Sequence, residues 1–592
     1  MQLTGTQFSN TSALAGNDLA TFPDFPAEIR APAGTLAGVS GFQVQIGSTE
    51  IYTPGDQPDV LIAMNPAALQ KNLEAMERGT TLILNKDAFD DRAMTKVGFE
   101  TDPTQDGTLE AYDVHVVPIT SLTFTALEDS PLSHRDKERC KNLFALGITY
   151  WMYARDLDYT VRWLETKFGN KPEIMDANLK ALKAGYYYGE TAEVFQTRYE
   201  VGAATISAGL YRQVTGNQAL AYGFIAAAEL ANLDLFLGSY PITPASDILH
   251  ELSKHKSHRV KTFQAEDEIA AVGSAIGAAF GGALAITATS GPGMALKAEA
   301  LGLAMITELP LVVINVQRGG PSTGLPTKTE QSDLLQALHG RNGESPCIVI
   351  AAQSPSDCFR TAIEAARLTT RYMCPVILLT DGYIANGAEP WLIPNKEEFE
   401  PIEVRFAGGE QGEAFLPYER DETTLARPWA PPGIPHLEHR IGGLEKAAGT
   451  GNVSYDSNNH EWMCKTRAEK VQRAVADIAD AEILGESTGD LLLIGWGGTY
   501  GSLRTAADEL QSEGLKVSHM HLRHLNPMPA NVAEVMRSFK HVVCAELNLG
   551  QLRGLLRAQF LVDVLGYNKV QGQPFRVSEL VEMAKKILEG SE

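Results

Sequence analysis

The middle of the chain repeats one pattern three times: an apolar run, a loop rich in Gly, Pro, Ser or Thr, and then a helical run. The apolar runs and their loops are residues 233–237 with 238–244, 284–289 with 290–293, and 309–316 with 317–323. Strands connected through helices normally pair in parallel by right-handed crossovers, so all three loops should meet at one edge of one sheet. Open α/β sheets bind ligands at that edge. The pattern therefore predicts an α/β domain with a binding site made of loops.

The length of 592 residues exceeds what one hydrophobic core usually organises, and we predict an α/β protein of three domains. Residues 1–185 mix strand-like and helical runs and end in a helical tail, and residues 205–395 hold the repeated pattern. Residues 396–470 are rich in Pro, Gly and charge, which predicts an extended linker. Residues 471–592 form the third α/β domain, opening with a helix. Its glycine-rich turn at 495–501 fits either a phosphate loop or close packing between strand and helix.

The charge balance and two segments of the chain limit the class of protein that this sequence can encode. With 50 basic and 73 acidic residues the formal charge is -23, which argues against nucleic acid or anionic membrane as the main partner. The uncharged run at 270–289 is as long as a membrane span, but Gly281 and Gly282 divide it, so we expect a buried helix and strand. The first 17 residues are polar and lack the features of a signal peptide, so we expect a cytoplasmic protein.

The six cysteines are scattered and include no CxxC pair and no Cys/His group at metal-ligand spacing in the sequence. They are Cys140, Cys347, Cys358, Cys374, Cys464 and Cys544. We therefore predict a reducing compartment and no metal or iron–sulfur site in this chain.

Three acidic residues, Glu266, Asp267 and Glu268, stand just before an apolar helical run that carries Gly273 and Gly277. Acids in the first turn of a helix often only cap it and complement its dipole. Taken alone, this segment favours that structural role.

Four motifs together change the interpretation. They are YPITP at 240–244, AEDEIAA at 265–271, TSGPG at 289–293 and VQRGGPSTGLPT at 316–327. In this order they resemble the pyrimidine-binding domain of 2-oxoacid:ferredoxin oxidoreductases. Further segments are similar to other parts of that family: PAEIR at 26–30 to its gamma-type domain, residues 458–467 to its interdomain segment, and residues 546–552 to its transketolase C-terminal-like domain.

The resemblance implies an alpha subunit that uses thiamine diphosphate to convert a 2-oxoacid, coenzyme A and oxidised ferredoxin into an acyl-coenzyme A, CO₂ and reduced ferredoxin. We expect 2-oxoglutarate as the substrate; pyruvate and branched-chain 2-oxoacids stay open. A non-oxidative thiamine enzyme subunit and a catalytically silent scaffold are the rival hypotheses.

The resemblance also implies a role for Glu268. Its carboxylate would engage N1′ of the aminopyrimidine, which lets that ring act as the base toward the C2 proton of the thiazolium. The family's glutamate precedes one glycine by five residues and another by nine, which matches Gly273 and Gly277. Glu266 is the alternative.

Arg318 and Thr243 match the residues that bind the substrate in the family. A cation and a hydroxyl donor suit a carboxylate beside a ketone on which negative charge develops. For Arg318 the alternative is a surface arginine, and for Thr243 it is the N-cap of the following helix.

Two further sets of residues are expected at the site. Those expected around the rings of the cofactor are Tyr240, Pro241, Ile242, Ser290 and Gly291. Those expected at the far end of the substrate are Thr323, Thr327 and Lys328. Lys328 would favour a dicarboxylate, with a solvated loop lysine as the alternative.

Two functions of the family have no residues in this chain. The diphosphate and Mg²⁺ need a Gly-Asp-Gly motif, and only Thr380-Asp381-Gly382 comes near it, in the wrong module. Electron transfer needs a cluster. The resemblance therefore implies a beta subunit with the diphosphate site, Mg²⁺ and a [4Fe-4S] cluster, thiamine at the interface, and an (alpha-beta)2 assembly. The family's first strand and glycine-rich turn would precede Met1, which leaves the details of coenzyme A binding open.

Overall fold

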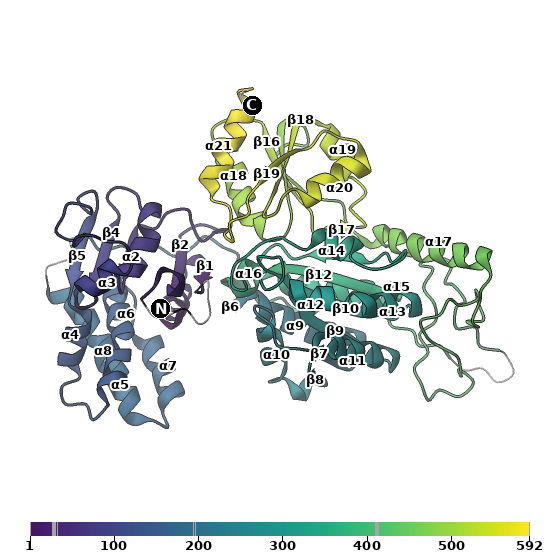
Figure 1. Cartoon of the computed structure of the whole chain (residues 1–592), viewed down its shortest axis with the longest axis horizontal. Coiled ribbons are helices and arrows are strands. Elements are labelled where there is room, and N and C mark those ends of the chain that lie inside the picture. The colour runs from purple at the N-terminus through teal and green to yellow at the C-terminus, as the bar shows by residue number, and fades with distance from the viewer. Residues whose placement is uncertain are drawn as a thin grey trace. The chain divides into compact units, whose positions relative to one another are not determined.

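The computed structural model describes residues 2–26, 31, 34–192, 195, 197–408 and 414–590. The chain forms two compact units, Met1–Gln213 and Val214–Glu592, drawn in Figure 1. Residues 27–30, which hold most of the PAEIR motif, lie outside the described residues. Within the described ranges, no helix combines the length and apolar content that crossing a bilayer requires.

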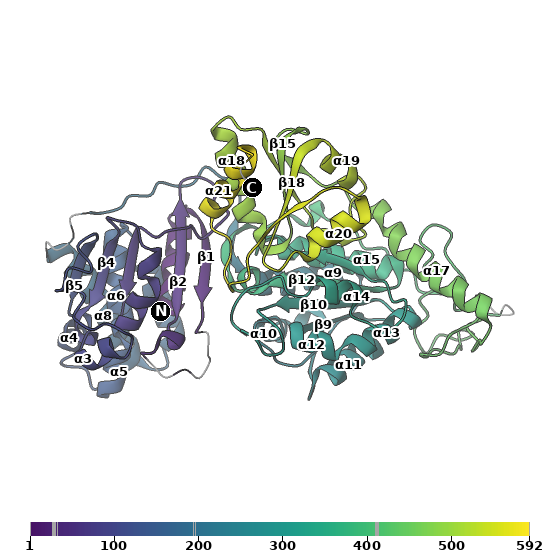
Figure 2. The same ribbon diagram turned by 45° about the horizontal axis from the view of Figure 1, so that its top comes forward.

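The first unit contains a parallel sheet of order β3-β4-β5 and an antiparallel pair, β1-β2 (Figure 2). The strand-like runs expected within residues 1–185 include β3 and β4. Its strands are β1 (Asp18–Asp24), β2 (Gly41–Gly47), β3 (Val60–Ala63), β4 (Thr81–Asn85) and β5 (Asp113–Val117). Its helices are α1 (Gln2–Leu14), α2 (Pro66–Asn72), α3 (Asp91–Thr95), α4 (Ile119–Ala126), α5 (His134–Arg139), α6 (Lys141–Met152), α7 (Asp158–Phe168) and α8 (Pro172–Thr191).

The predicted helical tail of this unit is α5 to α8, and α6 crosses α8 at two glycines. A Cβ on Gly147 would lie 2.1 Å from the carbonyl oxygen of Leu182, and one on Gly185 would lie 1.9 Å from that of Phe144. Only glycine permits this approach of two backbones, so the crossing point is fixed by the sequence.

The second unit is built on a sheet of order β17-β11-β12-β10-β9-β7-β8. All neighbouring pairs in it are parallel except β11 with β17. The strands of this part of the chain are β6 (Tyr211–Thr215), β7 (Leu235–Ser239), β8 (Val260–Gln264), β9 (Leu284–Thr289), β10 (Leu311–Gln317), β11 (Ile348–Ala351), β12 (Pro375–Asp381) and β13 (Ala388–Leu392). The helices are α9 (Gly216–Ala231), α10 (Ser246–Leu252), α11 (Glu268–Phe280), α12 (Gly291–Leu296), α13 (Ala298–Thr307), α14 (Leu334–His339), α15 (Asp357–Tyr372) and α16 (Gly382–Asn386).

The run at 270–289 forms the end of α11 and all of β9, as expected from its glycine pair. Gly282 has φ +89°, a backbone conformation that favours glycine, and the chain reverses there between helix and strand.

The C-terminal part of this unit has its own sheet, of order β14-β16-β15-β18-β19. Its elements are α17 (Ser457–Arg473), β14 (Ile483–Leu484), β15 (Gly489–Gly495), α18 (Tyr500–Ser512), β16 (Val517–His521), β17 (His524–Asn526), α19 (Val532–Arg537), β18 (Phe539–Glu546), α20 (Gln551–Phe560), β19 (Leu565–Asn568) and α21 (Val577–Leu588). Strand β17 leaves this sheet and pairs with β11, so the C-terminal segment completes the edge of the larger sheet.

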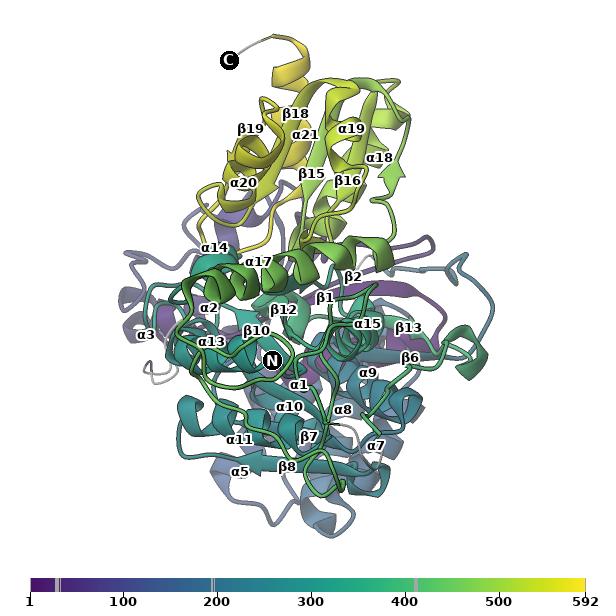
Figure 3. The same ribbon diagram turned by 90° about the vertical axis from the view of Figure 1, so that its right-hand side faces the viewer.

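The segment predicted as an extended linker is largely irregular as far as Asp456, the N-cap residue of α17. The helix expected to open the last domain near residue 471 therefore starts earlier, because the side chain of Asp456 accepts a hydrogen bond from the amide of Asn459. Figure 1 shows α17 extending beyond the side of the larger sheet, and Figure 3, viewed from that side, shows it in front of the sheet. The fully buried Lys470 of this helix donates to Glu308 over 2.5 Å, and Arg420 of the linker also pairs with Glu308.

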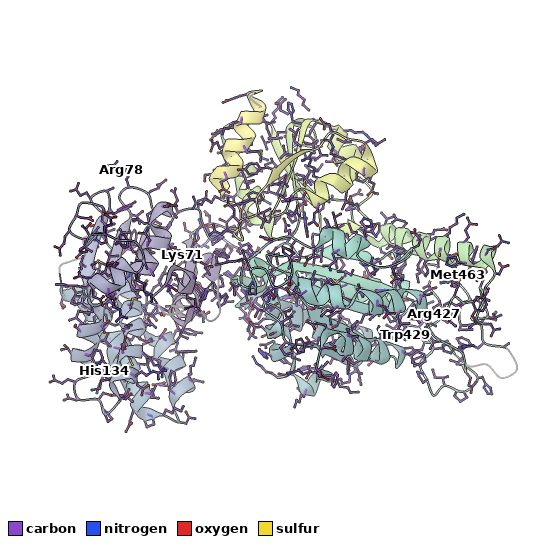
Figure 4. The ribbon with its side chains drawn as sticks, viewed as in Figure 1. Lys71, Arg78, His134, Arg427, Trp429 and Met463 are labelled. Carbon is purple, nitrogen blue, oxygen red and sulfur yellow. The ribbon has the colours of Figure 1, made fainter. Side chains whose placement is uncertain are left out.

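The linker also supplies hydrogen-bond donors to carbonyl groups in the last turns of α11 and α13. Trp429 donates its indole N–H to the carbonyl of Ala279 over 3.0 Å, and Arg427 donates to that of Thr307 over 3.0 Å. Figure 4 shows Arg427 and Trp429 close together on the linker, with Met463 on α17. Side chains that bond to the last carbonyls stabilise a helix end, so this linker holds the helices of the larger sheet in place.

Candidate active site

The loops that follow β7, β9 and β10 meet at the carboxyl edge of the larger sheet, as the repeated pattern predicts. These three strands are consecutive neighbours, and β8, which leads into Glu268, lies next to β7. Four motifs far apart in sequence therefore stand in a row along one edge. An edge of this kind can hold a ligand against several helix starts at once.

Glu268 is the first residue of α11 and is only 7% exposed. The cap of this helix is Asp267, whose side chain accepts a hydrogen bond of 2.7 Å from the amide of Ala270. The capping role considered for the three acids thus belongs to Asp267. Glu266 is exposed, so the buried carboxylate of this segment is that of Glu268.

The side chain of Glu268 is fixed by the TSGPG turn. A Cβ built on Gly293 would lie 2.9 Å from Cγ and 3.1 Å from Oε1 of Glu268, and 2.0 Å from Oγ1 of Thr289. Any side chain at position 293 would have to displace these groups. The turn therefore packs directly against the carboxylate of Glu268.

Lys297, between α12 and α13, is a site residue that sequence reasoning missed. It is fully buried, and its ammonium donates a hydrogen bond of 2.8 Å to the main-chain carbonyl of Glu268. Burial lowers its pKa to about 8, although the carboxylates of Glu268 and Asp267 act to raise it. The sequence signal was a lysine in the mostly apolar run at 294–304, which also holds Glu299.

Arg318 follows β10 and is brought against Thr243. Its Nη1 donates 2.7 Å to the main-chain carbonyl of Thr243, and the residue is only 6% exposed. The surface-arginine alternative is therefore wrong. The N-cap alternative for Thr243 is also wrong, because α10 begins at Ser246 with Ala245 as its cap residue, without a capping side chain.

Asp333 is a second residue that sequence reasoning missed. Its carboxylate accepts 3.0 Å from the amide group of Asn315 and 3.1 Å from the hydroxyl of Ser332. Burial raises the pKa of Asp333, while those two bonds and the charge of Arg318 act to lower it. Burial also lowers the pKa of Arg318, with Asp333 opposing. A Cβ on Gly291 would lie 3.1 Å from Oδ2 of Asp333, so this carboxylate lies directly behind the TSGPG turn.

Buried polar atoms without partners mark this edge as able to take a polar ligand. Within the described residues, Oγ of the fully buried Ser290 and Nε of Arg318 have no hydrogen-bond partner. An unpaired buried polar group is costly, and a bound polar molecule would relieve that cost. Tyr240, Pro241 and Ile242 form the neighbouring loop, with Tyr240 38% exposed. These features fit an aromatic heterocycle that carries polar groups.

The residues expected at the far end of a substrate lie on one loop after Arg318. Thr323 is exposed, and Thr327 and Lys328 are half-buried. The carbonyl of Lys328 accepts from the amide of Gly319 over 3.0 Å, which closes the loop. The first carbons of the Lys328 side chain lie against Gly572, whose built Cβ would be 2.7 Å away.

The Thr-Asp-Gly sequence at 380–382 has a structural role. Asp381 is fully buried, and its carboxylate accepts hydrogen bonds of 2.9–3.0 Å from the amides of Tyr383, Ile384 and Gly498 and from the hydroxyl of Thr329. Gly498 belongs to the glycine-rich turn at 495–501. That turn therefore packs against the larger sheet, which favours the packing interpretation over a phosphate loop.

One group among the described residues could bring three metal-ligand atoms together: Glu445, His460 and Cys464, with donor atoms within 4.8 Å of one another. The sequence did not reveal it, because Glu445 is distant from the other two in the chain. A guanidinium already lies there, since Arg467 donates 3.3 Å both to Glu445 and to the sulfur of Cys464.

Two family models match the chain. One, described as "Pyruvate flavodoxin/ferredoxin oxidoreductase, thiamine diP-bdg", covers residues 226–455, and one described as "Pyruvate ferredoxin/flavodoxin oxidoreductase" covers residues 1–188. The first includes the whole sheet edge described above.

Relatives match over most of the chain. The 2-oxoglutarate oxidoreductase subunit KorA of Mycobacterium tuberculosis is 56% identical over 592 residues, which is 100% of this chain and 90% of the relative. The alpha subunit of 2-oxoacid:ferredoxin oxidoreductase 1 of Aeropyrum pernix is 31% identical over 490 residues. The match covers 79% of this chain and 74% of the relative. The solved 2-oxoglutarate:ferredoxin oxidoreductase from Magnetococcus marinus, with 2-oxoglutarate, coenzyme A and succinyl-CoA bound, is 32% identical with a TM-score of 0.83, over 99% of this chain and 96% of that one.

The parallel sheet, the loops at its edge and the two family models define a ferredoxin or flavodoxin oxidoreductase with a thiamine-type domain. The chain belongs to the 2-oxoacid:ferredoxin oxidoreductase family, in which relatives are named as alpha subunits.

Proposed function

We propose that this chain is the alpha subunit of a thiamine-dependent 2-oxoglutarate:ferredoxin oxidoreductase. The reaction would convert 2-oxoglutarate, coenzyme A and oxidised ferredoxin into succinyl-coenzyme A, CO₂ and reduced ferredoxin. One observation carries the proposal: the buried carboxylate of Glu268 stands at the sheet edge, held by Gly293 of the TSGPG turn. The names of the relatives from Mycobacterium tuberculosis and Magnetococcus marinus favour 2-oxoglutarate among the 2-oxoacids.

Thiamine diphosphate, when bound, supplies the carbanion that attacks the ketone of a 2-oxoacid. The chain's part is to hold a proton at N1′ of the aminopyrimidine with the carboxylate of Glu268. With the carboxylate of Glu268 held there, the bound ring would supply the base of the reaction. Tyr240, Pro241, Ile242, Ser290 and Gly291 would surround the rings, with the unpaired Oγ of Ser290 as one available polar contact.

Arg318 and Thr243 would bind the reacting end of the substrate. Arg318 uses Nη1 to bind the carbonyl of Thr243, and its Nε has no partner among the described residues. A guanidinium held in this way is preorganised for a carboxylate and for charge developing on the ketone oxygen. Thr323, Thr327 and Lys328 follow on the same loop and would meet the second carboxylate of 2-oxoglutarate.

A beta subunit would complete the enzyme. The only near match to the diphosphate motif is used internally, because Asp381 accepts four hydrogen bonds from the protein. Five of the six cysteines are buried and none is in a disulfide. We therefore place the diphosphate site, Mg²⁺ and a [4Fe-4S] cluster on the beta subunit, in a cytoplasmic (alpha-beta)2 assembly. The first unit would contribute to coenzyme A binding.

The test is to co-purify the chain with a beta subunit and to follow viologen reduction. Reduction should require 2-oxoglutarate, coenzyme A and thiamine diphosphate together. Decarboxylation that needs no coenzyme A would support the non-oxidative alternative instead. A stable complex without turnover on any 2-oxoacid would support the scaffold alternative.

A further inference from the structure

Lys297 is a buried cation that the proposed reaction does not yet use. It lies between α12 and α13, where its main-chain amide bonds to the carbonyl of Gly293 over 3.1 Å and its own carbonyl accepts from Leu301 over 2.9 Å. Its side chain extends back to Glu268, 29 residues earlier in the chain, and has no exposed surface. A buried ammonium is unfavourable unless it is paired.

The charged groups around Lys297 are the acids of one helix start. Glu268 and Asp267 both act to raise its pKa against the effect of burial. Asp267 is engaged as the cap of α11, through its bond to Ala270. Glu268 is the buried one of these two acids. The positive charge of Lys297 therefore lies at the start of α11, beside the residue that carries the candidate catalytic carboxylate.

Lys297 and Gly293 restrain Glu268 at different points. Lys297 binds its main-chain carbonyl, and Gly293 contacts Cγ and Oε1 of its side chain. Both belong to the segment that starts with the TSGPG turn. Movement of that segment would therefore move the carboxylate and its cation together.

We propose that Lys297 is a positioning residue that holds the main chain of Glu268 and places a buried positive charge beside the site of the pyrimidine ring. This inference rests on the proposed function. In a site closed to water, a buried positive charge lowers the pH at which a bound ring would lose a proton. Without this charge, the ring would keep its proton to higher pH, and the imino form of the pyrimidine would be less populated at a given pH.

The experiment compares Lys297→Met, which keeps the length and removes the charge, with Lys297→Arg, which keeps the charge. Lys261→Met is the control, because Lys261 lies on β8 of the same sheet with a 67% exposed side chain. Each chain is purified with its beta subunit. The readouts are the near-ultraviolet circular dichroism band of the imino tautomer on addition of thiamine diphosphate as a function of pH, and the pH profile of kcat.

In Lys297→Met, the band should develop at a pH about one unit or more higher than in wild type. The acidic limb of kcat should shift in the same direction, with KM for 2-oxoglutarate changed less than about twofold. Lys297→Arg should restore most of both shifts. The same midpoint in wild type and Lys297→Met would overturn the proposal, as would a Lys297→Arg variant as shifted as Lys297→Met. If Lys297→Met does not assemble, Lys297→Arg alone is the test. The pH midpoint of its imino band should lie within about 0.3 unit of the wild-type midpoint, and a larger shift would overturn the proposal. A wild-type complex with neither band nor turnover would instead refute the proposed function itself.

Discussion

Gly293 lies so close to Glu268 that a methyl group at position 293 would be 2.9 Å from Cγ of the glutamate. The two residues are separated in the chain by the helix α11 and the strand β9, yet they lie against each other in the structure. The glycine therefore controls where the buried carboxylate points, although it carries no functional group of its own.

Gly293→Ala should lower kcat by about 100-fold, because the new Cβ would push Glu268 away from its position. Subunit association should persist. Steady-state kinetics of the co-purified complex measure the effect. Gly302→Ala, on α13, is the matched control, since its Cβ would have only an ordinary contact of 3.7 Å with Asn342. Equal kcat values for the two variants would show that Gly293 does not position the carboxylate.

Lys328→Ala should raise KM for 2-oxoglutarate about tenfold more than KM for pyruvate, because only the dicarboxylate offers a second anion to this side chain. Competition between the two substrates measures the ratio. Equal effects would assign Lys328 to packing against Gly572, where its first side-chain carbons lie.

Asp381→Ala should lower the free energy of unfolding by about 3 kcal/mol, because it leaves buried donors such as the amide of Gly498 without an acceptor. Thermal unfolding of the wild type should be unchanged by a chelator, since the carboxylate serves the protein itself. Stabilisation by added Mg²⁺ that is lost in Asp381→Ala would contradict this structural role.

His519 should make stability depend on pH. It is fully buried, neither ring nitrogen has a partner among the described residues, and burial, with Arg504 adding to it, lowers its pKa to about 3. The unfolded chain takes up this proton near the ordinary value of 6.5. Stability is therefore complete above pH 6.5 and falls as pH drops toward 3, by about 1 kcal/mol per pH unit.

His519→Leu should reduce that dependence, measured as the unfolding midpoint by calorimetry between pH 7 and pH 4, while His521, whose pKa burial also lowers, keeps its own contribution. His521 and Tyr500, whose rings contact His519, stay in place. The exposed His541 supplies the control variant His541→Leu. A wild-type midpoint that does not fall in acid would contradict the account of His519.

The sheet edge could be predicted from sequence because its elements are local. Each apolar run is followed directly by its glycine-rich loop, and right-handed crossovers then fix the shared edge. The break at Gly282 and the position of Glu268 at the start of α11 follow from the same local rules.

The residues that support the site could not be predicted in this way. Lys297 reaches Glu268 only because α12 and α13 fold back onto the start of α11, and Asp333 reaches the TSGPG turn only through the tertiary fold. The pairing of β17 with β11 has the same cause, since nothing in residues 524–526 identifies a partner in another sheet. Such contacts depend on how elements pack, and hydrophobic periodicity does not record that.

The most direct test compares Glu268→Ala with Glu266→Ala in the complex with the beta subunit, assayed by coenzyme A-dependent reduction of viologen with 2-oxoglutarate. Glu268→Ala should abolish turnover while the subunits remain associated, and Glu266→Ala, which changes an exposed residue, should retain nearly all of it. Wild-type rates in Glu268→Ala, or loss of turnover only in Glu266→Ala, would contradict the assignment of Glu268 as the carboxylate that faces the cofactor.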